Sequence, residues 1–526
     1  MKKYFLSIIM ALATVSLTSC GDDNTTYYTA ARAGFTIAEE ADGYEINKPI
    51  QFTDATTPEQ GSTITSWLWE FGDAAGSTST TQNPTFTYTS EGVYTVKLTV
   101  TDNHGLKANK SQNVTVLDPS KAISVQWAAA IKGSLTGGSS PAVSADGSAV
   151  YLLTGGSASE VGRLSAFNIQ TGGTAWILDI DAAMVAAHPG GSTAAGCKDI
   201  YSSPAVGSDG NIYFTVRDLK DASANRKLFV FSASTKGAIN WAYAGTDANL
   251  YAITPAVASN GDVYVAQRKG MIWKIKNGVC TEYTSGIGDI TGGLSLSTNG
   301  LLYGTGKGNT GYFAFDTTSG TGKWIYNAEF GGAASAFIGA LRSSQVSIGA
   351  DGTLYVVADK TTGGMILALN ADGTLKWQYD TPTAIADGGV AIAADGTVYA
   401  NLGTATDDNA SGIIALNADG TLKWQYNVNA SVQTTPMVDN RGYIHFIAAD
   451  ATYYIIKADG TLFAEQSLGE SCISAPVMDS KGNTFVAVTK DGSLQMLCVT
   501  SRATSYATNA VWSMRGQNPQ RTGLQK

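Results

Sequence analysis

The chain of 526 residues is 44% hydrophobic and 15% charged, which excludes a largely disordered protein because a chain of this kind can bury a large core. Its formal net charge of −9 at pH 7 repels polyanions, so we do not expect nucleic acid as a partner. Glycines (59) outnumber prolines (12), valine, threonine, tyrosine and tryptophan are plentiful, and long runs with helical periodicity are scarce. This combination predicts an all-β protein with short strands and tight turns.

The N-terminal residues have the pattern of a secretory signal peptide. Two lysines precede an apolar run that is short for a membrane span, and small residues lead up to Cys20, so we expect residues 1–19 to be the signal peptide. The sequence Leu17-Thr18-Ser19-Cys20 resembles the lipobox of bacterial lipoproteins. This resemblance implies that Cys20 begins the mature chain and carries acyl chains such as palmitate. At about 0.8 kcal/mol per buried methylene, more than one chain would hold the protein on a membrane.

An acidic tether, residues 20–32, follows the signal peptide. Its first part, Gly-Asp-Asp-Asn at residues 21–24, is similar to the surface-export signal of Bacteroidetes lipoproteins, with a merely solvated acidic linker as the alternative. No later run of the sequence is long and apolar enough for a membrane helix. We therefore expect an outer-membrane protein that is anchored in lipid through acylated Cys20 and faces the cell exterior.

Residues 33–118 alternate apolar and polar side chains with a period of two, as in "YTVKLTVTD" and "NVTVL", which predicts a small antiparallel sandwich. The run Trp69-Glu70-Phe71-Gly72-Asp73 and the later "YTSEGVYTVKLTVTD" resemble the PKD module of the immunoglobulin-like sandwiches. We expect Trp69 and Phe71 to point into the core. Such modules act as spacers or weak binding modules.

Residues 121–526 contain eight copies of one repeat, each with four short apolar runs separated by turn signals. Four such runs, A to D, predict a propeller blade, so we expect an eight-bladed β-propeller of four-stranded blades. Asp-Gly or Asn-Gly recurs between runs A and B, where a tight hairpin needs positive φ. A tryptophan recurs in run D, and we expect it to be a buried core residue between blades. The repeat resembles the PQQ-like β-propeller family.

The eighth repeat lacks a D run, and an upstream segment can supply it. The run "ISVQWAAAI", residues 123–131, resembles the D runs of the other repeats and has Trp127 at the tryptophan position. We expect this strand to complete the last blade and leave the ring without a free edge. The terminal segment, residues 510–523, is similar to a capping motif of such propellers, and we expect Trp512 and Arg515 to hold it in place.

One face of the predicted propeller carries all the long loops, because the A–B and C–D turns are uniformly short whereas the B–C and blade-to-blade connections vary in length. Loops on a rigid scaffold are where binding sites are usually built. We therefore expect ligand contacts from aromatic and polar residues that enter the A strands from that face: Tyr201, Tyr251, Arg342, Asp387 and Gln433. Each of them could instead be an ordinary packing or rim residue.

The sequence shows no catalytic or metal site. The three histidines, His104, His188 and His445, form no cluster, and the five cysteines include no adjacent pair or CxxC. Quinone dehydrogenases of similar fold use a pair of adjacent cysteines and a calcium site, so we expect no PQQ cofactor despite the family name. We expect the four cysteines after Cys20 to be buried free thiols and name no catalytic residue.

Three functions remain open, because the fold does not select among them. The first is a cell-surface lipoprotein that binds an extracellular ligand, a glycan, through the long-loop face of the propeller, with the PKD module as a spacer. The second is a scaffold or assembly lipoprotein that docks a surface protein. The third is a propeller-type polysaccharide lyase or hydrolase. We favour the first.

Overall fold

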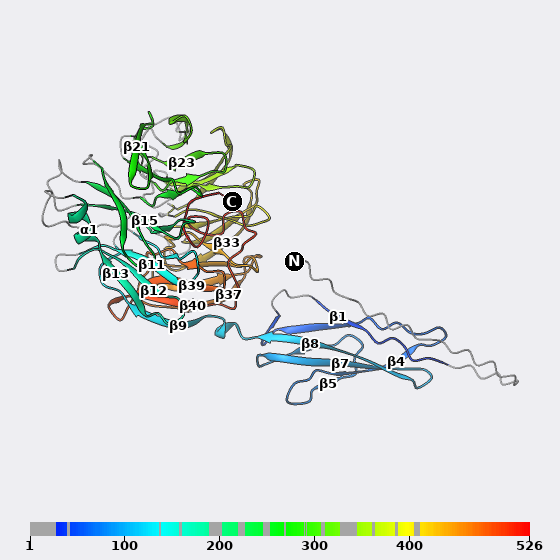
Figure 1. Cartoon of the computed structure of the whole chain (residues 1–526). Helices are drawn as coiled ribbons and strands as arrows, with labels where there is room; N and C mark the ends of the chain where they lie inside the picture. Colours follow the sequence, from blue (N-terminus) through cyan, green and yellow to red (C-terminus); the bar gives the residue numbers. More distant parts are fainter. Residues whose placement is uncertain are drawn as a thin grey trace, which may run out of the picture. The chain divides into compact units, whose positions relative to one another are not determined.

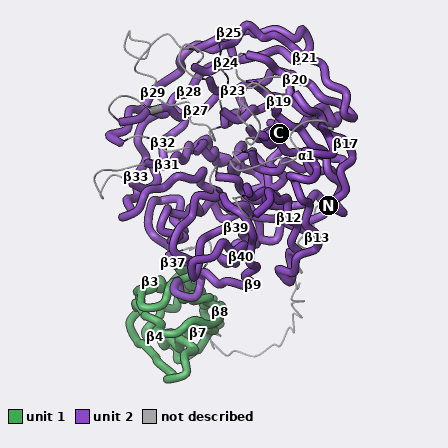
Figure 2. Tube along the Cα trace, turned by 90° about the vertical axis from the view of Figure 1, so that its left-hand side faces the viewer, with its two compact units in different colours: residues 1–118 green, residues 119–526 purple. Residues whose placement is uncertain are grey.

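The chain divides into two compact units, Met1–Asp118 and Pro119–Lys526 (Figure 2). A computed structural model describes residues 28–38, 43–135, 138–156, 160–188, 202–218, 227–245, 253–267, 270–288, 290, 292–306, 311–326, 345–359, 363–383, 385, 388–403 and 411–525. Among them, no helix is both long enough and apolar enough to cross a membrane. The predicted all-β architecture, a PKD sandwich followed by a β-propeller, is confirmed.

The first unit is a sandwich of two sheets. One sheet has the order β1-β3-β6, with bounds Phe35–Ile37, Pro49–Asp54 and Thr85–Thr87. The other has the order β2-β8-β7-β4-β5, with bounds Tyr44–Glu45, Lys107–Leu117, Gly92–Asp102, Ile64–Glu70 and Thr78–Ser79. All strand pairs are antiparallel except β2–β8. Alternation places every second residue of β7 in the core, as the period of two predicts.

Aromatic rings fill the core of this sandwich. Trp69 and Phe71 are 0% and 1% exposed, as expected from the sequence, and they pack with Phe35 and Phe52. The Tyr88 hydroxyl donates to the carbonyl of Phe71 at 2.8 Å. These contacts make the W-x-F-G-D motif a structural one.

The second unit contains eight four-stranded antiparallel sheets among the described residues, and Figure 1 shows several of them. We call them blades 1 to 8. Blades 1 to 4 are β10–β13 (Ala142–Val143, Ala149–Thr154, Arg163–Asn168, Thr174–Asp179), β14–β17 (Ala205–Val206, Ile212–Arg217, Leu228–Ala233, Ile239–Ala244), β18–β21 (Ala256–Val257, Val263–Gln267, Met271–Lys276, Val279–Thr284) and β22–β25 (Ser295–Leu296, Leu301–Thr305, Tyr312–Asp316, Thr321–Tyr326). Blades 5 to 7 are β26–β29 (Ser347–Ile348, Leu354–Asp359, Gly364–Leu369, Leu375–Thr381), β30–β33 (Ala391–Ile392, Val398–Leu402, Ser411–Leu416, Leu422–Val428) and β34–β37 (Met437–Val438, Ile444–Ile447, Thr452–Ile456, Leu462–Ser467).

Blade 8 is closed by a strand from the start of the unit. Its order is β38-β39-β40-β9, with bounds Val477–Met478, Asn483–Lys490, Ser493–Thr500 and Ser124–Ala130. Trp127 of β9 lies opposite Cys498 of β40, so the predicted closure is confirmed. In Figure 1 the cyan strand β9 runs beside the orange strand β40. This pairing joins the two ends of the unit.

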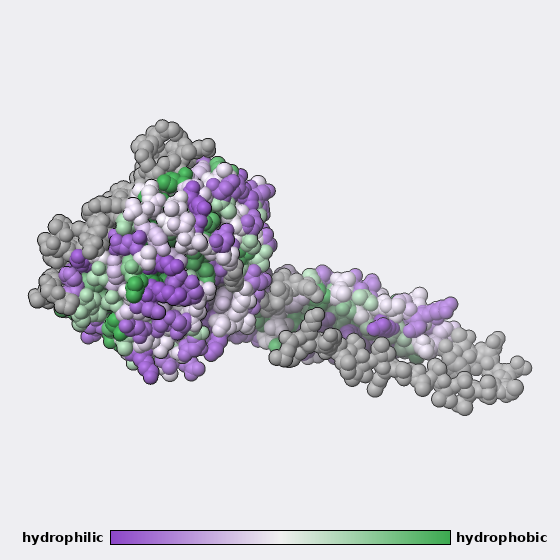
Figure 3. All heavy atoms as spheres, turned by 45° about the horizontal axis from the view of Figure 1, so that its top comes forward, coloured by the Kyte–Doolittle hydropathy of each residue, from purple (hydrophilic) through white to green (hydrophobic). Residues whose placement is uncertain are grey.

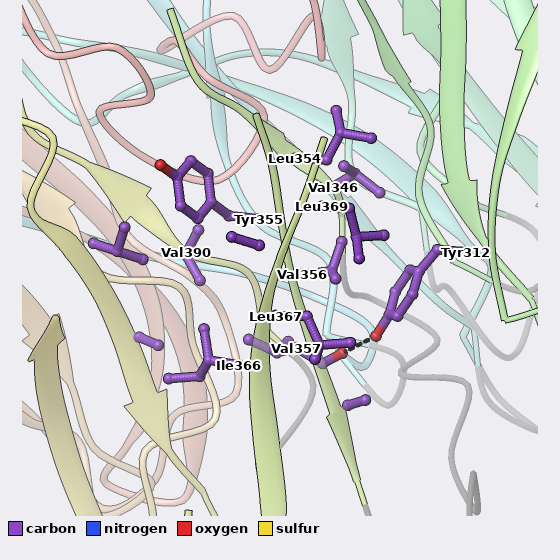
Figure 4. Close-up of a cluster of buried hydrophobic side chains, with 14 of the residues drawn as sticks. Tyr312, Val346, Leu354, Tyr355, Val356, Val357, Ile366, Leu367, Leu369 and Val390 are labelled. Atoms are coloured by element: carbon purple, nitrogen blue, oxygen red, sulfur yellow. Dashed lines mark hydrogen bonds between the residues drawn. The ribbon is translucent and has the colours of Figure 1, made fainter. Parts of the chain in front are cut away.

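The apolar residues of neighbouring blades pack against each other. In the close-up of Figure 4, Leu354, Val356, Leu367 and Leu369 come from β27 and β28 of blade 5. Tyr312 of blade 4 points toward blade 5, where its hydroxyl donates to the carbonyl of Val357 at 2.8 Å. The packing and the hydrogen bond together link the two blades.

The recurrent tryptophans of the D strands also link blades. Trp377 of blade 5, for example, donates its indole N–H to the carbonyl of Ala418 in blade 6 at 3.0 Å, and its ring covers Gly420. Equivalent indole bonds run from Trp127, Trp176, Trp324 and Trp424 to the next blade. The expectation that these residues are buried core was wrong: they are half-buried, because the D strand is the outermost strand of its blade.

Two short helices interrupt the strands within the described ranges. The 3-10 helix η1, Pro119–Lys121, leads into β9, and the α-helix α1, Ile180–Ala187, follows β13 in one of the long loops. Asp179 caps α1 by accepting a hydrogen bond from the backbone N–H of Ala182 at 3.0 Å. The sequence analysis did not predict α1.

Candidate functional site

The ring of blades has two ends along its axis, and the A–B turns lie at one of them. The C-terminal segment, residues 503–525, covers that end. Six A strands each donate one backbone N–H to a backbone carbonyl of this segment, at distances of 2.7–2.9 Å. The donors are Val143, Val206, Val257, Leu296, Ile392 and Val438. Gln525 reaches blade 5 at the carbonyl of Gly349, and Arg521 reaches blade 8 at Ala475. The segment therefore bonds to all eight blades, and we call this end the closed face.

The A–B turns at the closed face are tight because each contains a glycine with positive φ. The angles lie between 67° and 82° at the six sites predicted from the sequence: Gly147, Gly210, Gly261, Gly300, Gly352 and Gly396. The opposite end, where the blade-to-blade connections and B–C loops lie, is the open face. It is the face that the sequence analysis selected from its loop lengths.

Arg521 lies near the end of the C-terminal segment and is 1% exposed. Its guanidinium donates to the carbonyls of Pro141, Arg515, Ala475 and Pro476, so it joins blades 1 and 8. Burial, with the nearby Arg515 charge adding to it, lowers the pKa of Arg521 well below its usual range. Among the described residues no carboxylate contacts this cation, which is solvated by carbonyl dipoles instead.

Arg515 connects the C-terminal segment with the residues that lead into the A strand of blade 1. It is half-buried, and its guanidinium donates to the carbonyl of Gly138 at 3.3 Å and to the Ser140 hydroxyl at 3.1 Å. Trp512 is 1% exposed and pairs with Ile392. The expectation that Trp512 and Arg515 hold the terminal segment in place is confirmed.

A collar of mostly polar residues surrounds the axis next to Arg515. In each repeat a proline, or the residue that aligns with it, directly precedes the A strand. The collar consists of the residue just before that position: Ser140, Ser203, Thr254, Gly293, Gln345, Gly389, Thr435 and Ala475. Hydroxyls of the collar accept backbone N–H bonds from the neighbouring blade: Ser140 N–H donates to Ser203 Oγ, Ser203 N–H to Thr254 Oγ1, Gly389 N–H to Thr435 Oγ1 and Ala475 N–H to Ser140 Oγ, at 2.9–3.0 Å. These bonds hold the A segments in register around the axis.

A pocket of about 280 Å³ lies on the open face between blade 8 and its two neighbours. The connections 133–135 and 471–473 line it, together with Ala487, Thr489 and Leu494 of blade 8. Ile473 is 39% exposed at its rim, and the main-chain oxygen of Ile473 would lie 3.5 Å from a Cβ at Gly138, the residue that Arg515 binds. The pocket therefore adjoins the collar.

The three cysteines in the described part of the chain are free thiols. Cys472 lies in the wall of the pocket, and its burial raises the pKa of the thiol to about 12, so the thiol stays protonated. Cys472 and Cys498 are buried, as expected, whereas Cys280 is half-buried. Cys197 lies outside the described residues.

His445 takes part in a buried network near the closed face. Its ring nitrogens lie 2.9 Å from Asp439 Oδ2 and 2.8 Å from the Tyr453 hydroxyl. Arg441 donates two bonds to the same carboxylate oxygen, at 2.7 and 2.8 Å. Burial alone would raise the pKa of Asp439, but the bonds and charges of His445 and Arg441 outweigh burial and lower that pKa. The side chains of Arg441 and His445 are 7% and 0% exposed, so the network is a structural one.

Only one of the predicted ligand-binding residues can be placed. Tyr201, Tyr251, Arg342 and Asp387 lie outside the described residues, as does the lipidation site Cys20. Gln433 is half-buried on the open face, three residues before Pro436, and its amide donates to Ser431 Oγ at 3.3 Å. Ile473 occupies the equivalent position in the next repeat. No group of three or more His, Cys, Asp or Glu that could hold a metal occurs in the described part of the chain.

The sequence analysis missed the collar and Arg521. The signal for the collar was present, because Ser or Thr precedes proline in four of the repeats, as in "SSPAV" and "TTPMV". Nothing local marks Arg521, whose partner Pro141 is 380 residues away in the sequence. Exposed apolar side chains, such as Ile177, Val279 and Leu422, lie on different outer strands, and the apolar spots in the view of Figure 3 are small.

Comparisons with known proteins agree with this architecture. A family model described as PKD domain matches residues 37–116, and one described as outer membrane protein assembly factor BamB matches residues 272–452. Collagenase ColA of Bacillus cereus is 37% identical over 141 residues, which are 25% of this chain and 14% of the collagenase. The chain thus spans a small fraction of the length of this curated relative.

Two solved propeller structures cover most of the second unit. The structure of BamB from Moraxella catarrhalis is 15% identical with a TM-score of 0.48 and covers 72% of this chain and 98% of that one. The structure of the Dos1 propeller is 8% identical with a TM-score of 0.50 and covers 72% and 95%. At this identity the Dos1 likeness concerns the fold alone. The chain therefore contains a PKD domain, residues 37–116, followed by a BamB/PQQ-like β-propeller region, residues 272–452.

Proposed function

We propose that this protein is a lipid-anchored surface protein that captures an extracellular glycan at the open face of its propeller. The PKD domain and the propeller fit a role at a surface or in protein interaction. The observation that carries the proposal is the C-terminal segment, which bonds to all eight blades at one end of the axis. Because this segment covers the closed face, we expect a ligand to approach the axis from the open face, where the collar, Gln433 and the pocket lie.

The chemistry of the open face suits a ligand rich in hydroxyl groups. The collar contributes buried hydroxyl and amide groups beside the axis, and Gln433 adds an amide that is half-buried and bonded only weakly to Ser431. Sugars combine apolar CH faces with hydroxyls that need polar partners, and the adjoining pocket has the apolar side chains of Leu135, Ile473 and Leu494 in its wall. Polar groups next to an apolar pocket are the usual composition of a sugar site.

The remaining parts of the proposal concern location. Acylation of Cys20 would anchor the chain in the outer membrane, the acidic residues 21–24 would direct it to the cell exterior, and the PKD domain would act as a spacer. Mass spectrometry of the mature N-terminus, with Cys20→Ser as the unacylated control, tests the anchor. Protease treatment of intact cells tests the orientation: a chain that is cut only after the outer membrane is opened contradicts surface display.

Binding is tested with the full chain purified in detergent and applied to an array of immobilised polysaccharides. We expect retention on at least one glycan and weaker retention of Gln433→Ala. The matched control is Lys236→Ala, an exposed residue of a C–D turn at the closed face, which should bind as the wild type does. Retention on no glycan would refute the proposal. Release of soluble sugar products would assign the protein to the lyases or hydrolases instead.

Docking of a surface or secreted protein is the second candidate. The match of residues 272–452 to an assembly-factor model favours it, as does the exposed apolar side chain of Ile473 at the pocket rim. Cross-linking on intact cells tests this candidate. A single protein that is recovered with the wild type but not with Ile473→Asp, from cells that bind no glycan, would establish it in place of glycan binding.

A further inference from the structure

The pocket on the open face has an aliphatic wall without charge. The wall is formed by Leu135, Cys472, Ile473, Ala487 and Leu494. Burial raises the pKa of the Cys472 thiol to about 12, so the thiol is neutral, and it lies 3.4 Å from the main-chain oxygen of Ala487. None of the described lining residues carries a formal charge or an aromatic ring. The pocket therefore suits a neutral group with an aliphatic surface better than an ion or a sugar ring stacked on an aromatic side chain.

Polar groups without a hydrogen bond occur beside this wall. In the described part of the chain, the hydroxyls of Ser471 and Thr489 bond to no other residue. The backbone N–H and C=O groups of Gly133 and Ile473, which also line the pocket, have no partner within the described ranges. Ser471 is exposed and Thr489 is half-buried, so a ligand can reach both hydroxyls. The pocket thus offers hydrogen-bond donors and acceptors next to an apolar surface.

Much of the other backbone at the pocket is already paired. The Thr489 N–H donates to the carbonyl of Ser471 at 2.8 Å, and the Glu470 N–H donates to the carbonyl of Thr489 at 2.7 Å. The Ile131 N–H donates to the carbonyl of Leu494 at 2.9 Å. A peptide that adds as a strand needs a continuous row of unpaired groups along an edge. The described residues offer isolated groups instead, which match a compact ligand with a single amide.

The volume of the pocket limits what it can hold. At about 280 Å³ it is close to the lower end of the range for small-molecule sites, which is roughly 300–1,000 Å³. It can take one sugar unit or a substituent of that unit, and the remaining units of a glycan would lie outside it. Because the pocket adjoins the collar at Gly138, those units would extend toward the polar groups around the axis.

We propose that this pocket binds the acetamido group of a 2-acetamido sugar, an inference that rests on the proposed glycan binding. The methyl of that group would contact the aliphatic side chains of Leu135, Ile473 and Leu494, since burial of apolar surface is favourable. Its amide has one donor and one acceptor, which complement the unpaired backbone groups at the wall. The sugar hydroxyls would bond to Ser471 and Thr489. A sugar with a hydroxyl at C2 has neither the methyl nor the amide and leaves the wall in contact with a polar group.

The test compares sugars that differ only in the group at C2. The methyl glycosides of glucose, galactose and mannose are titrated against the full chain in detergent, each beside its 2-acetamido counterpart, and ligand-observed NMR gives the dissociation constants. In at least one pair we expect the acetamido sugar to bind about ten- to a hundredfold more tightly, because it buries a methyl group and forms amide hydrogen bonds. Since no charge is involved, the preference should not change with salt.

Two substitutions block the pocket in different ways. Ser471→Trp places a large ring at the exposed rim, where the fold should tolerate it, and Ala487→Leu fills the buried wall. Both should abolish the preference for the acetamido sugar. Ser319→Trp is the matched control, because Ser319 is an exposed residue of a C–D turn at the closed face, and it should keep the preference. Thermal unfolding shows whether lost binding reflects a lost fold, and Ser471→Trp keeps the test decisive if Ala487→Leu does not fold.

The outcomes separate this inference from the proposed function. If acetamido and hydroxyl sugars bind equally, or if folded Ser471→Trp keeps the preference, the inference is wrong while glycan binding stands. If no acetamido sugar binds but the array retains the protein on a glycan, the inference is again wrong alone. If no sugar or glycan binds at all, both fail. A protein that cross-links to the wild type but not to Ser471→Trp, with no sugar bound, would assign the pocket to protein docking instead.

Discussion

The closed and open faces of the propeller are built from the same strands but stabilised in different ways. At the closed face, the A–B turns contain positive-φ glycines, the Asp439 network is buried, and the C-terminal segment accepts backbone hydrogen bonds from six A strands. At the open face, the connections differ from blade to blade, and the collar leaves hydroxyl donors without acceptors in the described residues. The proposed function places binding at the open face, whereas the contacts at the closed face stabilise the ring, so we expect variants at the closed face to lose stability and variants at the open face to lose binding.

Deletion of residues 503–526 should have the largest effect. It removes the acceptors of six A-strand N–H groups and exposes the sites of Trp512 and Met514, which are 1% and 0% exposed. Each buried donor left without an acceptor costs about 1–3 kcal/mol, so the sum for the six donors is comparable to the whole stability of a typical domain. We expect loss of cooperative thermal unfolding of the propeller, measured by calorimetry. Arg521→Met, which keeps the segment but removes its cross-links, should lower the melting temperature without abolishing the transition. A truncated chain that melts as the wild type does would contradict our account of the closed face.

Asp439→Asn should have the second-largest effect on stability, and this effect should depend on pH. At neutral pH it leaves buried Arg441 and His445 without their carboxylate, which costs about 3–5 kcal/mol. The pKa of Asp439 is lower in the folded state than its ordinary value of 3.8, so its contribution is complete above pH 3.8 and is lost as the pH falls through the folded value. Urea unfolding at several pH values should therefore show a difference between wild type and variant that narrows only below pH 3.8. A difference that stays constant at low pH would refute the role of the charge.

The energetic contribution of a tryptophan contact between blades can be measured by comparing alanine substitutions at two glycines of nearly equal φ. Gly420 has φ +88°, and a Cβ there would lie 2.6 Å from the Trp377 ring, whereas Gly442 has φ +82° and open space around it. Both Gly→Ala changes cost about 1–2 kcal/mol of backbone strain, and Gly420→Ala should cost about 1–3 kcal/mol more for overpacking. Chemical denaturation of both variants measures the difference. Equal losses would show that the ring contact contributes little.

Gln433→Ala should have the smallest effect on stability, below about 0.5 kcal/mol, because the half-buried amide makes one long bond to Ser431. Its effect should be visible in glycan retention instead. A thermal melt and a binding measurement on the same sample test the contrast between the faces. If Gln433→Ala destabilises the fold as strongly as Asp439→Asn does, the proposed division of roles between the faces is wrong.

Much of this fold could be predicted because its signals are local. Alternation in β7, the Asp-Gly and Asn-Gly pairs and the repeat itself depend on residues a few positions apart. The closure of blade 8 was also predictable, since the segment around Trp127 has the pattern of a D strand while the eighth repeat lacks one. The faces with short and long connections followed from the loop lengths of the repeats.

The candidate site was much less accessible from the sequence. Of the five predicted ligand-binding residues, Gln433 alone lies in the described part of the chain, and the collar is assembled from residues of different repeats. The burial of the tryptophans was misjudged because a sequence pattern shows that a side chain faces a neighbour but not that its strand is the outermost one. The helix α1 was missed within a loop whose composition gave no clear period.

The sequence by itself determined the strand pattern, the turns, the PKD core and the repeat, because these depend on backbone preferences and side-chain periodicity over short distances. Only the tertiary structure decided which end of the axis is closed and which charges meet there. Arg521 contacts Pro141 and Ala475 across 380 and 46 residues of sequence, and Ser140 contacts Ala475 across 335. Contacts of this kind exist only when a ring closes, because closure brings the first and last repeats side by side.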